Sequence, residues 1–175
     1  MTLIRTASNT SRTLLFSLTI VAAAAVAQDL RGETRIYTLD PSNHGNPEGI
    51  AYDESTAAFF VGTIGDGTIY RGTLGNLTVT PFIPGPGHGV GGMKVARGKL
   101  YVAGGFSGRV LIYDIGAKQQ VAAFQTSGGF LNDLVVTPDG DVFVTDSFAP
   151  ILWRITAAQV AAGGGVPTGI PSARR

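Results

Sequence analysis

The sequence lacks several features that would assign it to a common class of protein. It contains no cysteine, which excludes disulfides, thiol redox chemistry and thiolate metal sites. Only 14% of its 175 residues are charged, with 13 basic and 12 acidic side chains, and like charges form no block. This composition excludes a disordered charged tail, and it gives little support to nucleic-acid binding through a basic face.

The N-terminal apolar stretch is too short for a transmembrane helix. It runs for 13 residues from Leu14 to Val26, whereas a spanning helix needs about 20. Arg5 and Arg12 precede it, and Ala25-Val26-Ala27 has the small-x-small pattern of a cleavage site. Residues 1–27 are therefore predicted to be a signal peptide, and the protein to be secreted or periplasmic with no membrane anchor after cleavage. The alternative is an uncleaved anchor.

Glycine is abundant, with 25 residues, and apolar side chains make up 44% of the chain, which is typical of a turn-rich β protein. A repeat of about forty residues supports this fold class. Phe60, Tyr101 and Phe143 are spaced by 41 and 42 residues, and each begins a predicted β-hairpin. The paired runs are 60–63 with 68–71, 101–104 with 111–114, and 143–146 with 152–155.

A further run precedes each hairpin, at 49–53, 92–96 and 133–137, and another follows the first two, at 77–83 and 119–125. Four short antiparallel strands per forty residues form a β-propeller blade. The sequence therefore predicts an all-β propeller with blades at 47–83, 89–125 and 130–155. Residues 28–46 are predicted to be a lead-in with a strand at Thr34–Leu39, and residues 156–175 an irregular tail.

Three blades cannot close a ring, because propellers need about four to eight. The chain is therefore expected to be part of a longer propeller, for which a frameshift, a gene fragment and a truncated sequence are alternative explanations. Open sheet edges also predict self-association.

The repeat places polar side chains at one end of the innermost strands. Glu48 lies there in the first blade and Asn132 in the third, so both are expected to face the central channel. Their oxygen atoms are ligands that Ca²⁺ or another divalent cation prefers. The alternative for Glu48 is a solvated loop acid, and the alternative for Asn132 and Asp133 is a turn entering a strand.

Two further residues are weak candidates for catalysis. Asp146 ends the second strand of the third blade and could act as a base, or it could be a turn acid. His88 lies in the linker before the second blade and could reach the channel, whereas His44 and His88 could also simply be solvated. No Gly-x-Ser-x-Gly motif supports a Ser-His-Asp hydrolase.

Two segments resemble one propeller family. Pro47-Glu48-Gly49-Ile50-Ala51-Tyr52-Asp53 is similar to the opening strand of the gluconolactonase, regucalcin and luciferin-regenerating-enzyme family, which includes senescence marker protein. Residues 131–140, with 142–147 after them, resemble that family's Asn-Asp, Pro-Asp-Gly and Thr-Asp-Ser segment.

The resemblance implies a six-bladed propeller with one divalent cation, commonly Ca²⁺, of which this chain holds about three blades. It implies that Glu48 is a metal ligand, and that Asn132 is a metal ligand or, with Asp133, a substrate-side residue. The implied activity is lactone or ester hydrolysis on a small molecule, with weak metal binding because the later-blade ligands have no counterparts here. The alternatives are a non-catalytic NHL-like module that binds a ligand or protein, and a nonfunctional fragment.

The signal peptide can be tested by mass spectrometry of exported protein. We expect the mature chain to begin at or near Gln28, because Ala25 and Ala27 meet the small-residue requirement of the cleavage site. Intact Met1 in a membrane fraction would contradict this prediction.

Overall fold

The computed structural model describes residues 34–39 and 45–172, and the chain divides into two units, Met1–Ile36 and Tyr37–Arg175. In the first unit, the described residues 34–36 contain no helix or strand. The predicted signal peptide and His44 lie outside the described residues. Among the helices that are described, none is long and apolar enough to cross a membrane.

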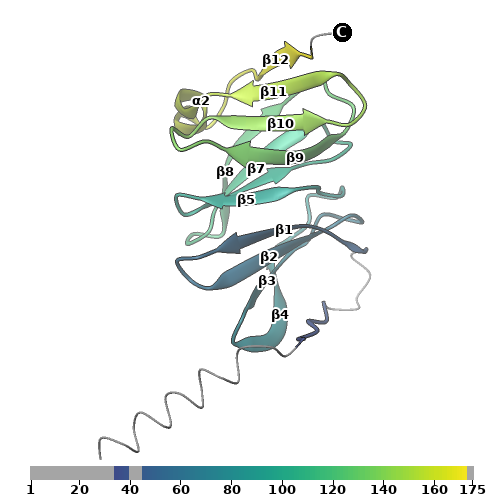
Figure 1. Ribbon diagram of the computed structural model, residues 1–175, viewed down its shortest axis with the longest axis vertical. Coiled ribbons are helices and arrows are strands. Elements are labelled where there is room, and N and C mark those ends of the chain that lie inside the picture. The colour runs from purple at the N-terminus through teal and green to yellow at the C-terminus, as the bar shows by residue number, and fades with distance from the viewer. Residues whose placement is uncertain (1–33, 40–44, 173–175) are drawn as a thin grey trace, which may run out of the picture. The chain divides into compact units, whose positions relative to one another are not determined.

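The second unit contains three four-stranded antiparallel sheets, each built from strands that follow one another in the chain (Figure 1). The first sheet has β1 (Pro47–Asp53), β2 (Ala58–Thr63), β3 (Ile69–Thr73) and β4 (Asn76–Ile83). The second has β5 (Met93–Ala96), β6 (Lys99–Ala103), β7 (Arg109–Asp114) and β8 (Gln119–Gln125). The third has β9 (Leu131–Val136), β10 (Val142–Asp146), β11 (Ile151–Ile155) and β12 (Thr168–Pro171), with helix α2 (Ala157–Ala162) between its last two strands.

Tight turns fix the register of these hairpins. Strands β5 and β6 are joined by Arg97 and Gly98, which have φ angles of 52° and 70°. Positive φ at both central residues is the mark of a type I′ turn, whose twist matches that of the flanking strands. The turn sets Ala96 opposite Lys99 and thereby fixes the pairing along both strands.

The sheets pack face to face and bury two large apolar cores. The core between the first two sheets includes Phe60, Ile69, Met93 and Leu100. The core between the second and third sheets is built from a larger set: Tyr101, Ala103, Val110, Ile112, Ala122, Phe124, Leu131, Leu134, Val142, Val144, Trp153 and Ile155. Each sheet-to-sheet contact is therefore a hydrophobic interface of the kind that joins propeller blades.

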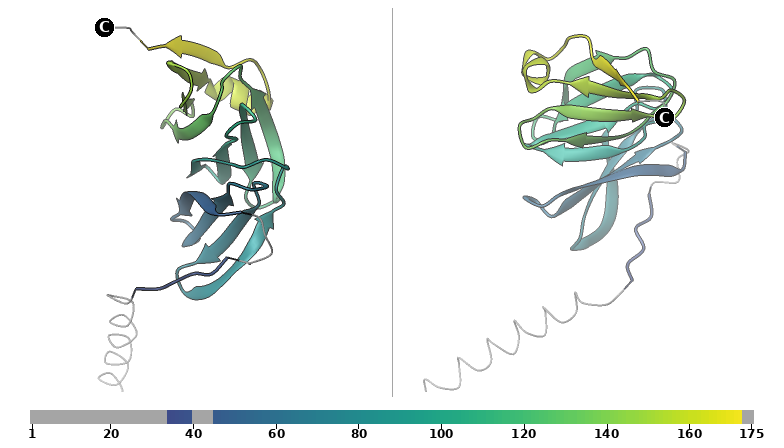
Figure 2. Two further views of the ribbon diagram at one scale, coloured as in Figure 1. Left: turned by 90° about the vertical axis from the view of Figure 1, so that its right-hand side faces the viewer. Right: turned by 45° about the horizontal axis from the view of Figure 1, so that its top comes forward.

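The innermost strands are those that the sequence predicted. Strands β1, β5 and β9 lie side by side at the centre of the second unit, and the outer strands β4 and β12 lie far from one another (Figures 1 and 2). Four-stranded antiparallel sheets arranged in this way are consecutive propeller blades. The predicted all-β fold with three partial-propeller blades is confirmed.

The prediction that residues 156–175 form an irregular tail is wrong. Thr156 caps α2 through a reciprocal pair of hydrogen bonds with Gln159, and Gly163 ends the helix with a φ of 74°. The chain then returns as β12, in which Ile170 lies opposite Leu152 of β11. This strand completes the third blade, for which the sequence had predicted three strands. A proline in β12 is tolerated because the strand lies at the sheet edge.

The predicted strand at Thr34–Leu39 is also absent, since residues 34–39 have no strand pairing. Instead, Tyr37 and Leu39 pack on the first sheet beside Phe59 and Val61. The rings of Tyr37 and Phe59 meet edge to face with centroids 4.9 Å apart, and the Tyr37 hydroxyl donates a hydrogen bond to the Leu74 carbonyl at 3.2 Å. Side-chain packing, rather than pairing, holds this segment.

The importance of blade packing can be measured with one substitution at two sites. Leu100→Ala removes a fully buried side chain from the first core and should lower the free energy of unfolding by about 2–5 kcal/mol. Leu77→Ala, at an exposed position of β4, should change it by no more than about 0.5 kcal/mol. Urea denaturation measures both values, and equal losses would contradict the assigned core.

Candidate functional site

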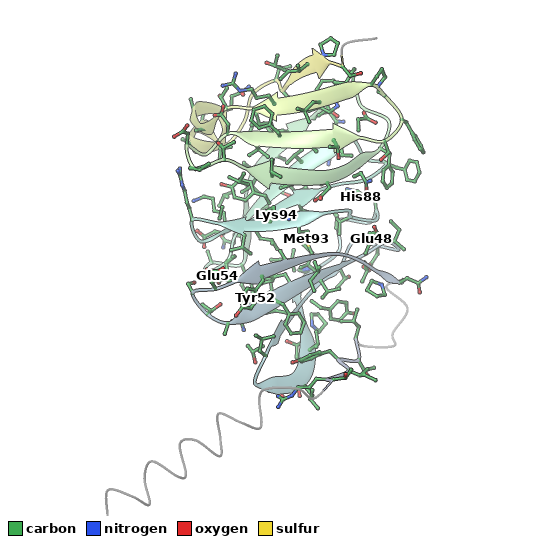
Figure 3. The ribbon with its side chains drawn as sticks, viewed as in Figure 1. Glu48, Tyr52, Glu54, His88, Met93 and Lys94 are labelled. Carbon is green, nitrogen blue, oxygen red and sulfur yellow. The ribbon has the colours of Figure 1, made fainter. Side chains whose placement is uncertain are left out.

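One pocket lies where the three innermost strands begin. It has a volume of about 400 Å³ and brings together residues from all three blades, including Glu48 of β1, Lys94 of β5, and Asn132 and Asp133 of β9. Glu48 and His88 lie at one end of these strands, whereas Tyr52 and Glu54 lie at the other (Figure 3). The sequence therefore identified three of the polar residues that line the pocket, and it missed Lys94.

Glycines allow the inner strands to approach closely at this point. A Cβ atom on Gly49 would lie 2.1 Å from the Gly91 carbonyl oxygen, and one on Gly92 would lie 2.0 Å from Asp133 Oδ1. Both distances are far below van der Waals contact, so a side chain at either position would push neighbouring blades apart. The Gly92 N–H also donates to the Asn132 carbonyl at 2.6 Å, which ties the second blade to the third.

The acidic groups of the pocket are only partly occupied by protein hydrogen bonds. Asp133 Oδ1 accepts a hydrogen bond from the Leu134 N–H at 2.8 Å, whereas its second oxygen accepts none from the described residues. The side chains of Glu48 and Asn132 are exposed to solvent. Two carboxylates and the Lys94 ammonium give the pocket a net charge of −1.

Asp146, in contrast, is occupied by a network that joins two loops. Its carboxylate accepts five hydrogen bonds of 2.9–3.4 Å from the backbone N–H groups of Gly129, Phe130, Phe148 and Ala149 and from the indole N–H of Trp153. Partial burial raises its pKa, but the hydrogen bonds outweigh that effect and hold the pKa below the ordinary value. This geometry favours the turn acid over the catalytic base.

His88 is half-buried in the linker between β4 and β5. Its Nδ1 lies 3.2 Å from the Gly89 carbonyl oxygen, and the residue does not contribute to the lining of the pocket. Among the described residues, no three His, Cys, Asp or Glu side chains gather in a group that could hold a metal. The oxygen donors of this pocket are instead two carboxylates and one amide.

An aromatic cluster at the loops of the second and third blades was not predicted. Phe106 and Phe148 are 71% and 69% exposed, and their ring centroids are 5.7 Å apart. The Phe130 ring lies 4.6 Å from the first and 5.8 Å from the second. The available signal was a phenylalanine in each of three turn segments, but nothing in the sequence shows that these turns meet.

A second pocket, of about 420 Å³, lies beside helix α2. Arg97, Lys99 and Tyr101 line it together with small residues of the helix, and no carboxylate does. Burial raises the pKa of Tyr101, against a smaller opposing effect of Arg97. None of the predicted site residues lies here, so this pocket is separate from the inner-strand site.

Comparison with known proteins supports the fold. No family model matches the chain. No curated protein matches it either. Among solved structures, hydrazine synthase of Kuenenia stuttgartiensis is similar over 72% of this chain, with a TM-score of 0.60 and 18% identity. A chain of a nidogen–laminin complex is similar over 71%, with a TM-score of 0.59 and 11% identity. U3-55K is similar over 69%, with a TM-score of 0.58 and 13% identity.

These neighbours are propeller proteins, and at such low identity the likeness concerns the fold alone. The matched regions cover 38%, 48% and 35% of the three solved chains. The chain therefore spans between about a third and a half of the structures that it resembles.

The structural role of Asp146 can be tested through the pH dependence of stability. Because its pKa is lowered on folding, its stabilising effect is complete above the ordinary value of 3.8 and is lost as the pH falls through the folded pKa. Asp146→Asn should therefore lower the thermal midpoint at pH 7, and the difference from the unaltered protein should shrink below pH 3.8. Thermal unfolding followed by circular dichroism measures this.

The matched control is Asp139→Asn, which changes an exposed acid in the turn between β9 and β10. It should leave the midpoint nearly unchanged at pH 7. An equal loss of stability in the two variants would contradict the role assigned to Asp146.

Proposed function

We propose that this chain is part of an exported β-propeller whose inner-strand pocket binds a hard divalent cation, such as Ca²⁺, together with a small lactone or ester. The observation that supports the proposal is that Glu48, Asn132 and Asp133 line one pocket although they come from different blades. The resemblance of their two segments to the gluconolactonase family points to the same cation and the same substrate class. The predicted signal peptide supports export.

The chemistry of the donors fits a hard cation. Carboxylate and amide oxygens are the ligands that Ca²⁺ takes in proteins, and the net negative charge of the pocket favours a cation. Ca²⁺ takes about six to eight oxygens, so three side chains form a weak site. Lys94 weakens it further because its ammonium group lines the same pocket.

Each polar residue has a role in this proposal. Glu48 of the first blade and Asn132 of the third would hold the cation through side chains that face solvent. A bound cation polarises a carbonyl oxygen and stabilises the negative charge that develops there. Asp133 has one oxygen fixed by the Leu134 N–H, and its second oxygen can accept a proton from an attacking water. Lys94 can pair with an anionic group of the substrate.

The aromatic cluster supports a second candidate, a non-catalytic module that binds a ligand or protein at its loops. Three neighbouring phenylalanine rings, two of them more than two-thirds exposed, form a contact surface that hydrolysis does not require. Phe106→Ala should then abolish binding of the ligand, whereas Glu48→Gln should leave it unchanged. The reverse pattern supports the cation site.

The cation site can be tested by thermal unfolding with and without CaCl₂. A ligand that binds only the folded state stabilises it by about 2.7 kcal/mol at a concentration of 100 times its dissociation constant. Glu48→Gln should abolish the Ca²⁺-dependent shift because it removes the carboxylate charge. Glu54→Gln should retain the shift, since Glu54 lies at the opposite end of β1.

Hydrolysis of glucono-δ-lactone provides a second readout of the same variants. Activity should require added Ca²⁺ and should be lost in Glu48→Gln and in Asp133→Asn. A Ca²⁺ response that persists in Glu48→Gln would contradict the proposed site, and hydrolysis that does not depend on Ca²⁺ would contradict the proposed chemistry.

A further inference from the structure

The pocket beside α2 gathers positive charge at a contact between two blades. Its cations are Arg97, in the turn between β5 and β6, and Lys99, at the beginning of β6. The third blade forms the other wall, with Gly140 and the residues of α2. Strands β1, β5 and β9 run in the same direction (Figure 1), so this turn lies at the end of the inner strands away from Glu48. The pocket therefore lies away from the proposed cation site.

The backbone brings three hydrogen-bond donors to this pocket. Lys99 and Tyr101 are two residues apart in β6, so they share one face of the sheet, and the Tyr101 side chain packs in the core between the second and third blades. Arg97 also reaches the third blade, because its guanidinium donates a hydrogen bond to the Pro138 carbonyl. Gly140 leaves room for it, since a Cβ atom there would lie 2.8 Å from Arg97 Nη1.

The Tyr101 hydroxyl makes no hydrogen bond with the described residues, although the side chain is only 2% exposed. Buried polar groups almost always have a hydrogen-bond partner. Burial raises the pKa of Tyr101 above its ordinary value of 10.0, so the hydroxyl is protonated at neutral pH and can donate a hydrogen bond. A buried hydroxyl that lines a cavity and lacks a protein partner is available to a bound group.

The positive charges of the pocket are not neutralised by acids. No carboxylate lines it, and neither of its two cations forms an ion pair with a described residue, so its net charge is +2. Two acids lie next to its lining residues in the sequence or the sheet, and both are bound elsewhere. Asp141 pairs with Arg154 at 2.6 Å, and Asp114, which is opposite Lys99, accepts a hydrogen bond from a backbone N–H of its own turn at 2.8 Å.

We propose that this pocket binds a small organic anion, namely a carboxylate or a phosphate joined to a short apolar group. Arg97 and Lys99 pair with its charge, and the Tyr101 hydroxyl donates a hydrogen bond to one of its oxygens. The apolar part lies against Val121 of β8 and Val160 of α2, which line the same pocket. The volume of about 420 Å³ lies in the range of small-molecule sites.

A ligand in this position connects two blades. Helix α2 has no fully buried residue, and only Val160 packs on the core between the second and third blades. An anion held between the helix and the second blade adds contacts that the helix otherwise lacks. Because it binds the folded state, the anion should also raise the thermal midpoint in proportion to its affinity.

Isothermal titration calorimetry on the whole chain tests the class of ligand. Phenyl phosphate and benzoate each combine an anion with a small apolar ring, whereas inorganic phosphate lacks the ring and benzyl alcohol lacks the charge. At least one of the two organic anions should bind more tightly than both comparison compounds, and the tighter one identifies phosphate or carboxylate as the preferred group. Failure of both organic anions to bind, or equal binding of either comparison compound, would overturn the proposal.

Three substitutions test the donors. Lys99→Gln and Tyr101→Phe each remove one donor without breaking a hydrogen bond within the described residues. Each should weaken binding of the organic anion by about tenfold or more and leave the circular dichroism spectrum unchanged. Arg97→Asn removes the guanidinium and places a residue that tolerates the φ of 52° in the turn, and it should weaken binding by at least as much. Unchanged affinity in Lys99→Gln and Tyr101→Phe would overturn the site.

Two further lysines show whether the anion occupies this pocket. Lys118→Gln removes a positive charge from the same blade outside the pocket, and its affinity should equal that of the unaltered protein. Lys94 lines the inner-strand pocket instead. Loss of binding in Lys94→Gln, with full binding in Lys99→Gln, would place the anion at the inner strands and overturn the proposal. Lys99→Gln should retain the Ca²⁺-dependent shift, so this site and the cation site can fail separately.

Discussion

The structure depends on the packing of one sheet face on another. All six residues of β2 are buried, and four of the five residues of β6 are buried, so neither strand has a face suited to water. A sheet with apolar side chains on both faces is stable only between two neighbours. The middle blade meets this requirement with a blade on each face. The first blade meets it with the second blade on one face and with Tyr37 and Leu39 on the other, whereas the third blade packs on a neighbouring blade on one face within the described residues. The need to cover both faces of each sheet therefore determines the stability of the repeat and how much apolar surface its end blades expose.

The same packing creates the pocket. Blades can fan around an axis only if their inner edges approach closely, and Gly49 and Gly92 leave room for neighbouring backbone and for Asp133 at the narrowest point. Polar side chains at the beginnings of the inner strands consequently line the same pocket.

Asp146 and Asp133 of the third blade differ in role because different numbers of backbone N–H groups surround their carboxylates. The hydrogen-bond donors of two loops fix both oxygens of Asp146, whereas Asp133 has one oxygen bound by a neighbouring N–H.

Local signals in the sequence were sufficient for most of the fold. The spacing of Phe60, Tyr101 and Phe143 located the three hairpins, because each residue begins a β-branched and aromatic run that is bounded by turn residues. Strand β12 was not predicted because its four residues include a glycine and a proline, and the open edge of β11 determines its pairing. The register of the repeat also located the polar residues at the inner strands. The aromatic cluster and the contribution of Lys94 depend on contacts between blades, which spacing along the chain does not encode.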